Sequence, residues 1–197
     1  MIAAAGRRGV DGVEFDVRAA RDGTPVVVHD ADLWRVQGVD RPVSDLTVAE
    51  LGELGVPDLE GVLAALPDSF FLDVELKENV SARVIPLLAH ARGDPPRQTV
   101  VSSFLPEAIS AVRKAAIGWP CWLINVRLDE HVVSAAQAIG CRGLAIEWPA
   151  LRRSAVDLVR EAGLELATWT IPDRATLRRV LALGIDAVCV DPPALPD

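Results

Sequence analysis

Hydrophobic and polar residues alternate along the start of the chain with a period of two. In GVEFDVR, residues 12–18, every second side chain is apolar, and this is the pattern of a strand with one buried face. Asp22 and Gly23 follow, and an Asp-Gly pair after such a strand predicts a hairpin turn. The apolar run Val26–Val28 is then the return strand, which ends at His29 and Asp30.

From residue 69 onward, short apolar runs alternate with amphipathic segments. Strands are predicted at 69–77, 99–104, 121–126, 143–148, 165–171 and 187–191, and helices at 81–91, 106–116, 129–139, 154–162 and 173–183. Several of these helices end in a glycine that leads directly into the next strand, in a cycle of about 22 residues. This alternation predicts a parallel sheet, and the cycle is typical of a (β/α)8 barrel of the TIM type.

The segment between the hairpin and this alternation has a weaker pattern. Glycines and prolines interrupt residues 31–57, which predicts loops and a short helix that starts at Thr47, with Glu50 completing a capping box. A further helix is predicted at 59–66, and residues 2–8 resemble the tail of a helix. With the first strand, the chain supplies about seven strand units, whereas a closed barrel has eight and about 250 residues. We therefore expect one barrel domain over residues 1–197, with its first strand missing and a short insertion at about 30–57.

Composition narrows the classes of function. The 197 residues carry a net charge of −8, which argues against a nucleic-acid partner but not against a small phosphorylated substrate, because a metal can supply positive charge locally. Three cysteines without a CxxC motif argue against a zinc or redox site and favour a reducing compartment such as the cytoplasm. We expect no membrane span, because no run approaches the roughly 20 apolar residues that a span needs. The first residues also lack the apolar core of a signal peptide.

Carboxylates gather on two of the predicted strands. A period of two places Glu14 and Asp16 on one face, about 7 Å apart. The strand at 69–77 carries Asp73, Glu75 and Lys77 on one face in the same way. Since a barrel has its site at the carboxyl ends of its strands, these groups can converge, and ligation by oxygen alone suits Mg²⁺ or Ca²⁺. Lys77 would then meet a phosphate oxygen or neutralise the carboxylates, and a solvated strand face is the alternative for Glu14 and Asp16.

Two further side chains are candidates for the same site. His29 has a natural pKa near neutrality, which suits general acid or base catalysis, although a histidine alone in this position also suits a turn or a surface role. Trp169 lies at a predicted strand end in TWT and could form a wall of the pocket or pack as a core aromatic.

Six segments, in order along the chain, add a second kind of argument. They are GVDGVEFDVRAARDGTPVVVHDADLWR, VPDLEGVLAALP, DVELK, VVSSF, ATWTIPD and LGIDAVCVDPP. The first resembles the signature of the glycerophosphodiester phosphodiesterase family, with its Glu-x-Asp-Val, Lys/Arg-Asp-Gly and Val-Val-x-His-Asp. Each other segment resembles the corresponding family motif, and on the six together the chain is identified as a member of that family.

The resemblance implies a (β/α) barrel that hydrolyses glycerophosphodiesters to an alcohol and glycerol 3-phosphate with Mg²⁺ or Ca²⁺. It implies that a carboxylate trio would hold the metal, namely Glu14, Asp16 and Glu75. It also implies that Lys77 would contact the phosphate, that His29 would protonate the leaving alcohol, and that Trp169 would line the substrate pocket.

The chain departs from the family pattern in several places. The family begins with a strand ending in His-Arg-Gly, which carries a second catalytic histidine and a phosphate-binding arginine. Only thirteen residues precede Glu14, and the GRR at 6–8 contains no histidine. Pro172 stands where the family has Asn, Val190 stands where it has Thr, and the insertion before Pro57 is short. We therefore expect the chain to lack several kcal/mol of transition-state stabilisation.

Three hypotheses follow. The first is an enzyme whose natural start lies upstream of Met1. The second is a barrel with impaired or no catalysis that keeps a site for a metal or phosphoester. The third is a lysophospholipase D-like phosphodiesterase on the same barrel.

Overall fold

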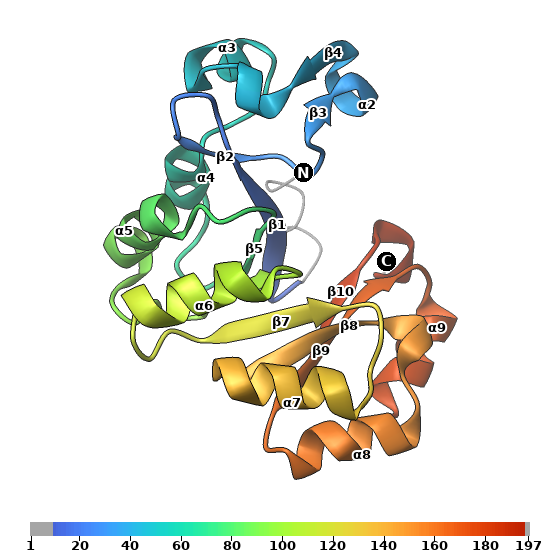
Figure 1. The fold of residues 1–197 in the computed structure, drawn as a ribbon. Coiled ribbons are helices and arrows are strands. Elements are labelled where there is room, and N and C mark those ends of the chain that lie inside the picture. Colours follow the sequence, from blue (N-terminus) through green and yellow to red (C-terminus); the bar gives the residue numbers. More distant parts are fainter. Residues whose placement is uncertain (1–9, 196–197) are drawn as a thin grey trace.

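A strongly curved sheet with helices on its outer face forms the centre of the molecule, as seen in a computed structural model that describes residues 10–195 (Figure 1). The strand order is β10-β9-β8-β7-β6-β5-β1-β2. Seven strands run parallel: β1 (Gly12–Ala19), β5 (Phe71–Leu76), β6 (Thr99–Ser103), β7 (Cys121–Asn125), β8 (Gly143–Glu147), β9 (Glu165–Ile171) and β10 (Ala187–Val190). The eighth, β2 (Pro25–Val27), pairs with β1 in antiparallel fashion. The predicted (β/α) barrel fold, with about seven strand units, is confirmed.

The helices that connect the strands are α4 (Leu59–Ala65), α5 (Ser81–Arg92), α6 (Pro106–Ala115), α7 (Glu130–Ile139), α8 (Arg153–Glu161) and α9 (Arg174–Leu181). Several begin where the sequence provides an acceptor for unpaired backbone N–H groups. The Asp129 carboxylate accepts from Val132 N at 3.0 Å, and that of Asp173 accepts from Thr176 N at 2.8 Å. Predicted helix and strand positions agree with the structure to within about two residues, the usual uncertainty of element ends.

The period of two along the strands produces two separate apolar regions. The outer face packs Phe15, Val17, Leu72, Val74 and other strand residues against the helices in one continuous core. The inner face carries a smaller cluster, which includes Val100, Trp122, Ile124, Ala145 and Ala167. On β1 and β5 the inner face carries polar side chains instead, namely Glu14, Asp16, Asp73 and Glu75, and the candidate site lies there.

The sheet does not close on itself within residues 10–195. In this part of the chain β10 pairs only with β9, and β1 pairs with β5 on one side and with β2 along its last residues on the other. The first half of β1, including Glu14, thus has a free edge there. The helical tail predicted at 2–8 lies outside the described residues.

A small subdomain with its own core follows the β1–β2 hairpin. It contains β3 (Asp32–Leu33), α2 (Trp34–Gln37), β4 (Val39–Pro42), the 3₁₀ turn η1 (Val43–Asp45) and α3 (Val48–Glu53). Its buried residues are Ala20, Val26, Leu33, Val43, Leu46, Leu51 and Val56. The predicted capping box of Thr47 and Glu50 is present, whereas β3, α2 and β4 lie where the sequence indicated only loops.

No helix in residues 10–195 has both the length and the apolar character needed to cross a membrane.

Two 3₁₀ turns, η2 (Trp148–Ala150) and η3 (Pro192–Ala194), follow β8 and β10 at the carboxyl end of the barrel.

Candidate active site

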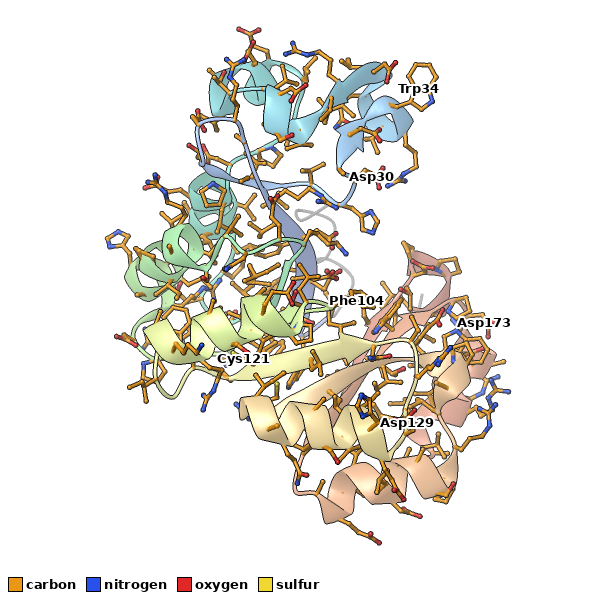
Figure 2. The ribbon with its side chains drawn as sticks, viewed as in Figure 1. Asp30, Trp34, Phe104, Cys121, Asp129 and Asp173 are labelled. Carbon is orange, nitrogen blue, oxygen red and sulfur yellow. The ribbon has the colours of Figure 1, made fainter. Side chains whose placement is uncertain are left out.

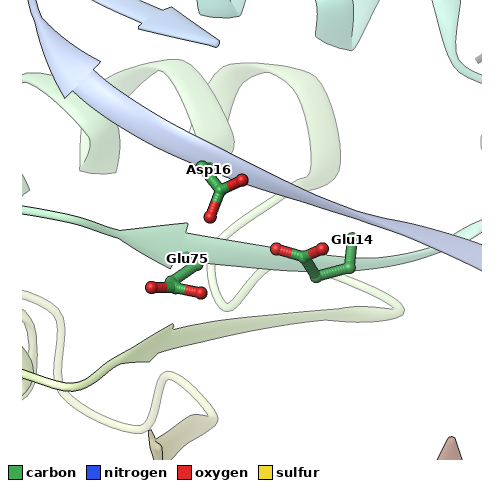
Figure 3. A group of neighbouring side chains, drawn as sticks. All are labelled: Glu14, Asp16 and Glu75. Carbon is green, nitrogen blue, oxygen red and sulfur yellow. The ribbon is translucent and has the colours of Figure 1, made fainter. Parts of the chain in front are cut away.

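Three carboxylates from two neighbouring strands meet on the inner face of the barrel. The register pairs Glu14 with Asp73 and Asp16 with Glu75, so the period of two on each strand brings the same face together. One carboxylate oxygen from each of Glu14, Asp16 and Glu75 lies within 4.8 Å of the others, and Figure 3 shows the three groups directed toward one another. Glu14 is exposed at the free edge of β1, and Glu75 is buried.

The crowding of negative charge changes the proton affinity of these groups. Desolvation, followed by the charges of Asp16, Asp73 and Glu75, raises the pKa of Glu14 to about 8. Because the Glu14 residue is exposed, we attribute the rise mainly to repulsion by these neighbours. Burial raises the pKa of Asp73 to about 7 against the opposing hydrogen bond from Ser102 Oγ at 2.5 Å.

Lys77 neutralises part of this cluster. Its Nζ lies 2.9 Å from Asp16 Oδ1 and also donates to Glu75 Oε1. Burial alone would lower the pKa of Lys77, but the hydrogen bonds to Glu75 and Asp16 outweigh it and raise the pKa. At Glu75, in contrast, burial dominates and raises the pKa, although the hydrogen bond and charge of Lys77 lower it. One ammonium thus faces three or four carboxylates, and the remaining negative charge fits a hard divalent cation with oxygen ligands.

His29 is held next to this cluster by the hairpin. Val28 N donates to the Asp16 carbonyl at 3.0 Å, and Arg18 Nε donates to the His29 carbonyl at 2.9 Å. The imidazole Nδ1 lies 2.7 Å from Asp30 Oδ1. Since its side chain is 62% exposed, its other ring nitrogen remains available for a substrate. His29 is also near enough for its charge to lower the pKa of Glu75.

Asp30 links His29 to the subdomain. Arg35 Nε on α2 donates to Asp30 Oδ2 at 2.6 Å, and these contacts, that of Arg35 first, lower the pKa of Asp30 to about 2. Asp30 therefore stays ionised and accepts from both neighbours, which fixes the orientation of the imidazole. Figure 2 shows Asp30 at the side of the subdomain that faces the barrel, and Trp34 at its outer tip.

Aromatic side chains lie next to the carboxylate cluster. Trp169 is half-buried on β9, donates from Nε1 to the Ala145 carbonyl at 3.2 Å, and packs edge-on against Phe104 with ring centroids 5.5 Å apart. Lys77 Nζ lies 5.7 Å from the centroid of the Phe104 ring. A continuous series from Lys77 through Phe104 to Trp169 thus joins the carboxylate cluster to the aromatic wall.

The structure brings together the six residues that the sequence singled out, and it adds others. The role of each remains a prediction. Arg35 was missed because it lies in a segment without periodicity, and Phe104 because its strand-end position alone did not separate it from other apolar residues. The HD pair at 29–30 was the available signal for the contact between His29 and Asp30.

Comparisons with known proteins agree with this arrangement. The model of the Glycerophosphoryl diester phosphodiesterase family matches residues 1–195. A glycerophosphodiester phosphodiesterase of Arabidopsis thaliana is 24% identical over 96% of this chain, which spans 64% of that protein. A glycerophosphodiester phosphodiesterase from Thermotoga maritima superposes with a TM-score of 0.82 at 26% identity, covering 98% of this chain and 87% of the other.

A further solved structure includes a ligand. It is an Oleispira antarctica phosphodiesterase in complex with the product sn-glycerol-3-phosphate, with a TM-score of 0.87, 24% identity, and coverage of 98% of this chain and 86% of the other. The match of the family model over nearly the whole chain establishes the family to which the chain belongs. The chain belongs to the glycerophosphoryl diester phosphodiesterase family, whose members are phosphoric diester hydrolases.

Proposed function

We propose that the chain hydrolyses glycerophosphodiesters to an alcohol and glycerol 3-phosphate in a reaction that depends on a divalent metal, Mg²⁺ or Ca²⁺. The observation that carries this proposal is the convergence of Glu14, Asp16 and Glu75 beside His29 on the inner face of β1 and β5. The product complex of the Oleispira enzyme, which has the same fold, supports the substrate class.

The proposed metal ligands are Glu14, Asp16 and Glu75. Their oxygens are close enough for one ion, and their mutual repulsion favours a cation between them. When bound, the ion would polarise a phosphoryl oxygen and offset the charge that develops on the phosphate.

The proposed roles of the remaining groups follow from their positions. Lys77, already among the carboxylates, is placed to donate to a phosphate oxygen. His29 would donate a proton from Nε2 to the oxygen of the leaving alcohol, because Nδ1 is occupied by Asp30. Asp30, held by Arg35, would stabilise the protonated imidazole. Trp169 and Phe104 would line the substrate pocket and limit the access of water.

The test is turnover of glycerophosphocholine by the purified chain, measured as glycerol 3-phosphate released with Mg²⁺, with Ca²⁺ and with EDTA. His29→Ala and Glu75→Gln should each reduce the rate to near background, whereas His90→Ala, on the exposed side of α5, should leave it unchanged. General acid catalysis commonly contributes a factor of about 10² to 10⁴, so the His29 variant gives a clear signal.

Two results would contradict the proposal. Turnover that persists in EDTA would exclude the metal, and turnover that survives His29→Ala would exclude the assigned acid. If a metal ion raises the melting temperature but no turnover occurs, the second hypothesis, a barrel that binds a metal or phosphoester without cleaving it, is favoured instead.

A second candidate, lysophospholipase D-like cleavage, is supported by the apolar tip of the subdomain. Trp34 and Val36 on α2 are each 66% exposed, and Arg35 between them contacts Asp30. An exposed tryptophan next in sequence to Arg35, which contacts the candidate site through Asp30, suits an acyl chain more than water. Lysophosphatidylcholine should therefore be compared with glycerophosphocholine at equal concentration, and Trp34→Ala should slow only the lipid reaction. A preference for the lysolipid would replace the first candidate.

Two broader assignments accompany the proposal. We treat residues 1–197 as one barrel domain with an insertion at about 30–57. We also place the reaction in a reducing compartment such as the cytoplasm, because all three cysteines are free thiols.

A further inference from the structure

A pocket rich in arginine lies on the outside of the barrel, where η2 and the start of α8 approach α9. It has a volume of about 470 Å³, which lies in the usual range for small-molecule sites. Trp148, Leu151, Val180 and Leu183 form its apolar part, and the cationic residues that line it are Arg152, Arg153 and Arg179. Figure 1 shows α8 and α9 covering the outer face of the sheet, while the carboxylate cluster lies on the inner face, so this pocket is separate from the candidate active site.

The three guanidinium groups are positioned by neutral partners. Arg152 Nη1 donates to the Pro149 and Leu151 carbonyls at 2.6 and 2.8 Å. Arg153 donates to the Ala182 and Leu183 carbonyls at 3.0 and 3.3 Å. These bonds leave further N–H donors on each guanidinium.

Arg179 stacks on an aromatic ring. Its Cζ lies 5.1 Å from the centroid of the Trp148 ring, an arrangement that orients the guanidinium while leaving its edge free to donate. The charge of Arg179 helps to lower the pKa of Asp173, whose carboxylate accepts a hydrogen bond from Thr176 N at the start of α9.

Carboxylates compensate these charges only in part, through the influence of Arg179 on Asp173. Within residues 10–195 no ion pair joins Arg152, Arg153 or Arg179 to an acidic side chain. Residues 148–183 contain six arginines and four acidic residues, a net charge of +2, so the rest of the chain carries −10. A local cluster of cations on an otherwise acidic protein favours an anion with several acceptor oxygens.

We propose that this pocket binds the phosphate group of an organic phosphate, either a soluble phosphomonoester or the headgroup of an anionic lipid. The fork of N–H donors on arginine matches phosphate geometry. Arg152, Arg153 and Arg179 contact the phosphate, and the attached organic group lies against Trp148 and Leu151.

Tryptophan indole resonances of ¹⁵N-labelled protein can report the two sites separately. Trp148 reports the arginine pocket and Trp169 the candidate active site, and Trp148→Phe assigns the first signal. In EDTA, titration with inorganic phosphate should shift the Trp148 signal in a saturable way. Arg152→Gln and Arg179→Gln should weaken this binding at least about ten-fold, because each removes charge-assisted hydrogen bonds. Arg178→Gln, an exposed neighbour outside the pocket, is the matched control.

Vesicles distinguish the two sources of phosphate. Co-sedimentation with vesicles that contain phosphatidic acid, absent with pure phosphatidylcholine and lost in Arg179→Gln, would identify a lipid headgroup. Phosphate binding without co-sedimentation would identify a soluble phosphomonoester. The absence of both, or a Trp148 response that persists in Arg179→Gln, would overturn the proposal. Lys77→Met should leave the Trp148 response unchanged, because Lys77 belongs to the candidate active site and not to this pocket. Failure of the phosphate-binding proposal can therefore be told apart from failure of the proposed activity.

Discussion

Replacing Lys77 with methionine should have opposite effects on metal binding and on catalysis. Lys77 Nζ lies 2.9 Å from Asp16 Oδ1, and an ion bound to the same oxygen would lie about 2.3 Å from it. The ammonium and the ion would then be at most about 5 Å apart if both contact that oxygen. The ammonium therefore opposes metal binding, although the same positive charge would assist a phosphate.

The magnitude follows from Coulomb's law. A single and a double positive charge about 5 Å apart repel by about 1.7 kcal/mol at the dielectric constant of water, or roughly twenty-fold in affinity. Salt reduces this value, whereas the partial burial of Lys77, whose side chain is only 15% exposed, increases it. We therefore expect Lys77→Met to bind Mg²⁺ or Ca²⁺ roughly ten- to hundred-fold more tightly. Loss of a charge-assisted contact to phosphate should lower kcat/KM for glycerophosphocholine by a similar factor.

Titration calorimetry without substrate measures the first quantity, and release of glycerol 3-phosphate measures the second. Lys114→Met is the matched control, because Lys114 is the other lysine of the chain and is exposed at the end of α6. Circular dichroism establishes that each variant is folded. Metal binding that weakens in Lys77→Met would refute the electrostatic reasoning, and an unchanged kcat/KM would refute the assignment of Lys77 to the phosphate.

Three further predictions concern titration, helix capping and the thiols. Burial and repulsion raise the pKa of Glu14 to about 8 and that of Asp73 to about 7, so without metal the folded state holds protons that the unfolded state has lost. Stability should then fall as pH rises from about 4 to about 8, and Asp73→Asn should flatten this slope in thermal melts; a slope of opposite sign would disprove it. Asp173→Ala should cost about 1 kcal/mol in urea unfolding through loss of the Thr176 N acceptor, whereas Asp173→Asn should cost less, and equal costs would argue against capping. Burial raises the thiol pKa of Cys121, Cys141 and Cys189 to about 12, 11 and 12, respectively. Iodoacetamide should therefore label these thiols at neutral pH only in urea, and rapid labelling of the native protein would contradict this prediction.

Local patterns in the sequence were sufficient to predict the repeating part of the fold. Strand periodicity and glycines at helix ends mark most elements from β5 to β10, because each depends on interactions between near neighbours. The carboxylate cluster was also predictable. Glu14 and Asp16 share a face by periodicity, and the parallel sheet pairs them with Asp73 and Glu75.

Contacts that depend on irregular backbone were not predictable in the same way. The bond from Arg35 to Asp30 requires the turn after β2 and the short α2 to have one particular geometry. Neither segment has a hydrophobic period that would indicate it. The sequence allowed two interpretations of Lys77, contact with a phosphate oxygen or neutralisation of the carboxylates. The ion pairs with Asp16 and Glu75 show that it neutralises them.

The separate core of the subdomain has a consequence for how this protein can change. Its buried residues, such as Leu33, Val43 and Leu51, form a cluster distinct from those of the barrel, so it can open locally without disrupting the sheet. Hydrogen exchange should then show two cooperative units, with the subdomain exchanging first. Trp34, which we propose to contact a lipid chain, and Arg35, which holds Asp30, lie in the subdomain that we expect to open first, and the carboxylates lie in the barrel. Exchange of residues 31–57 between relatives would therefore alter substrate preference while leaving the barrel and its carboxylates intact.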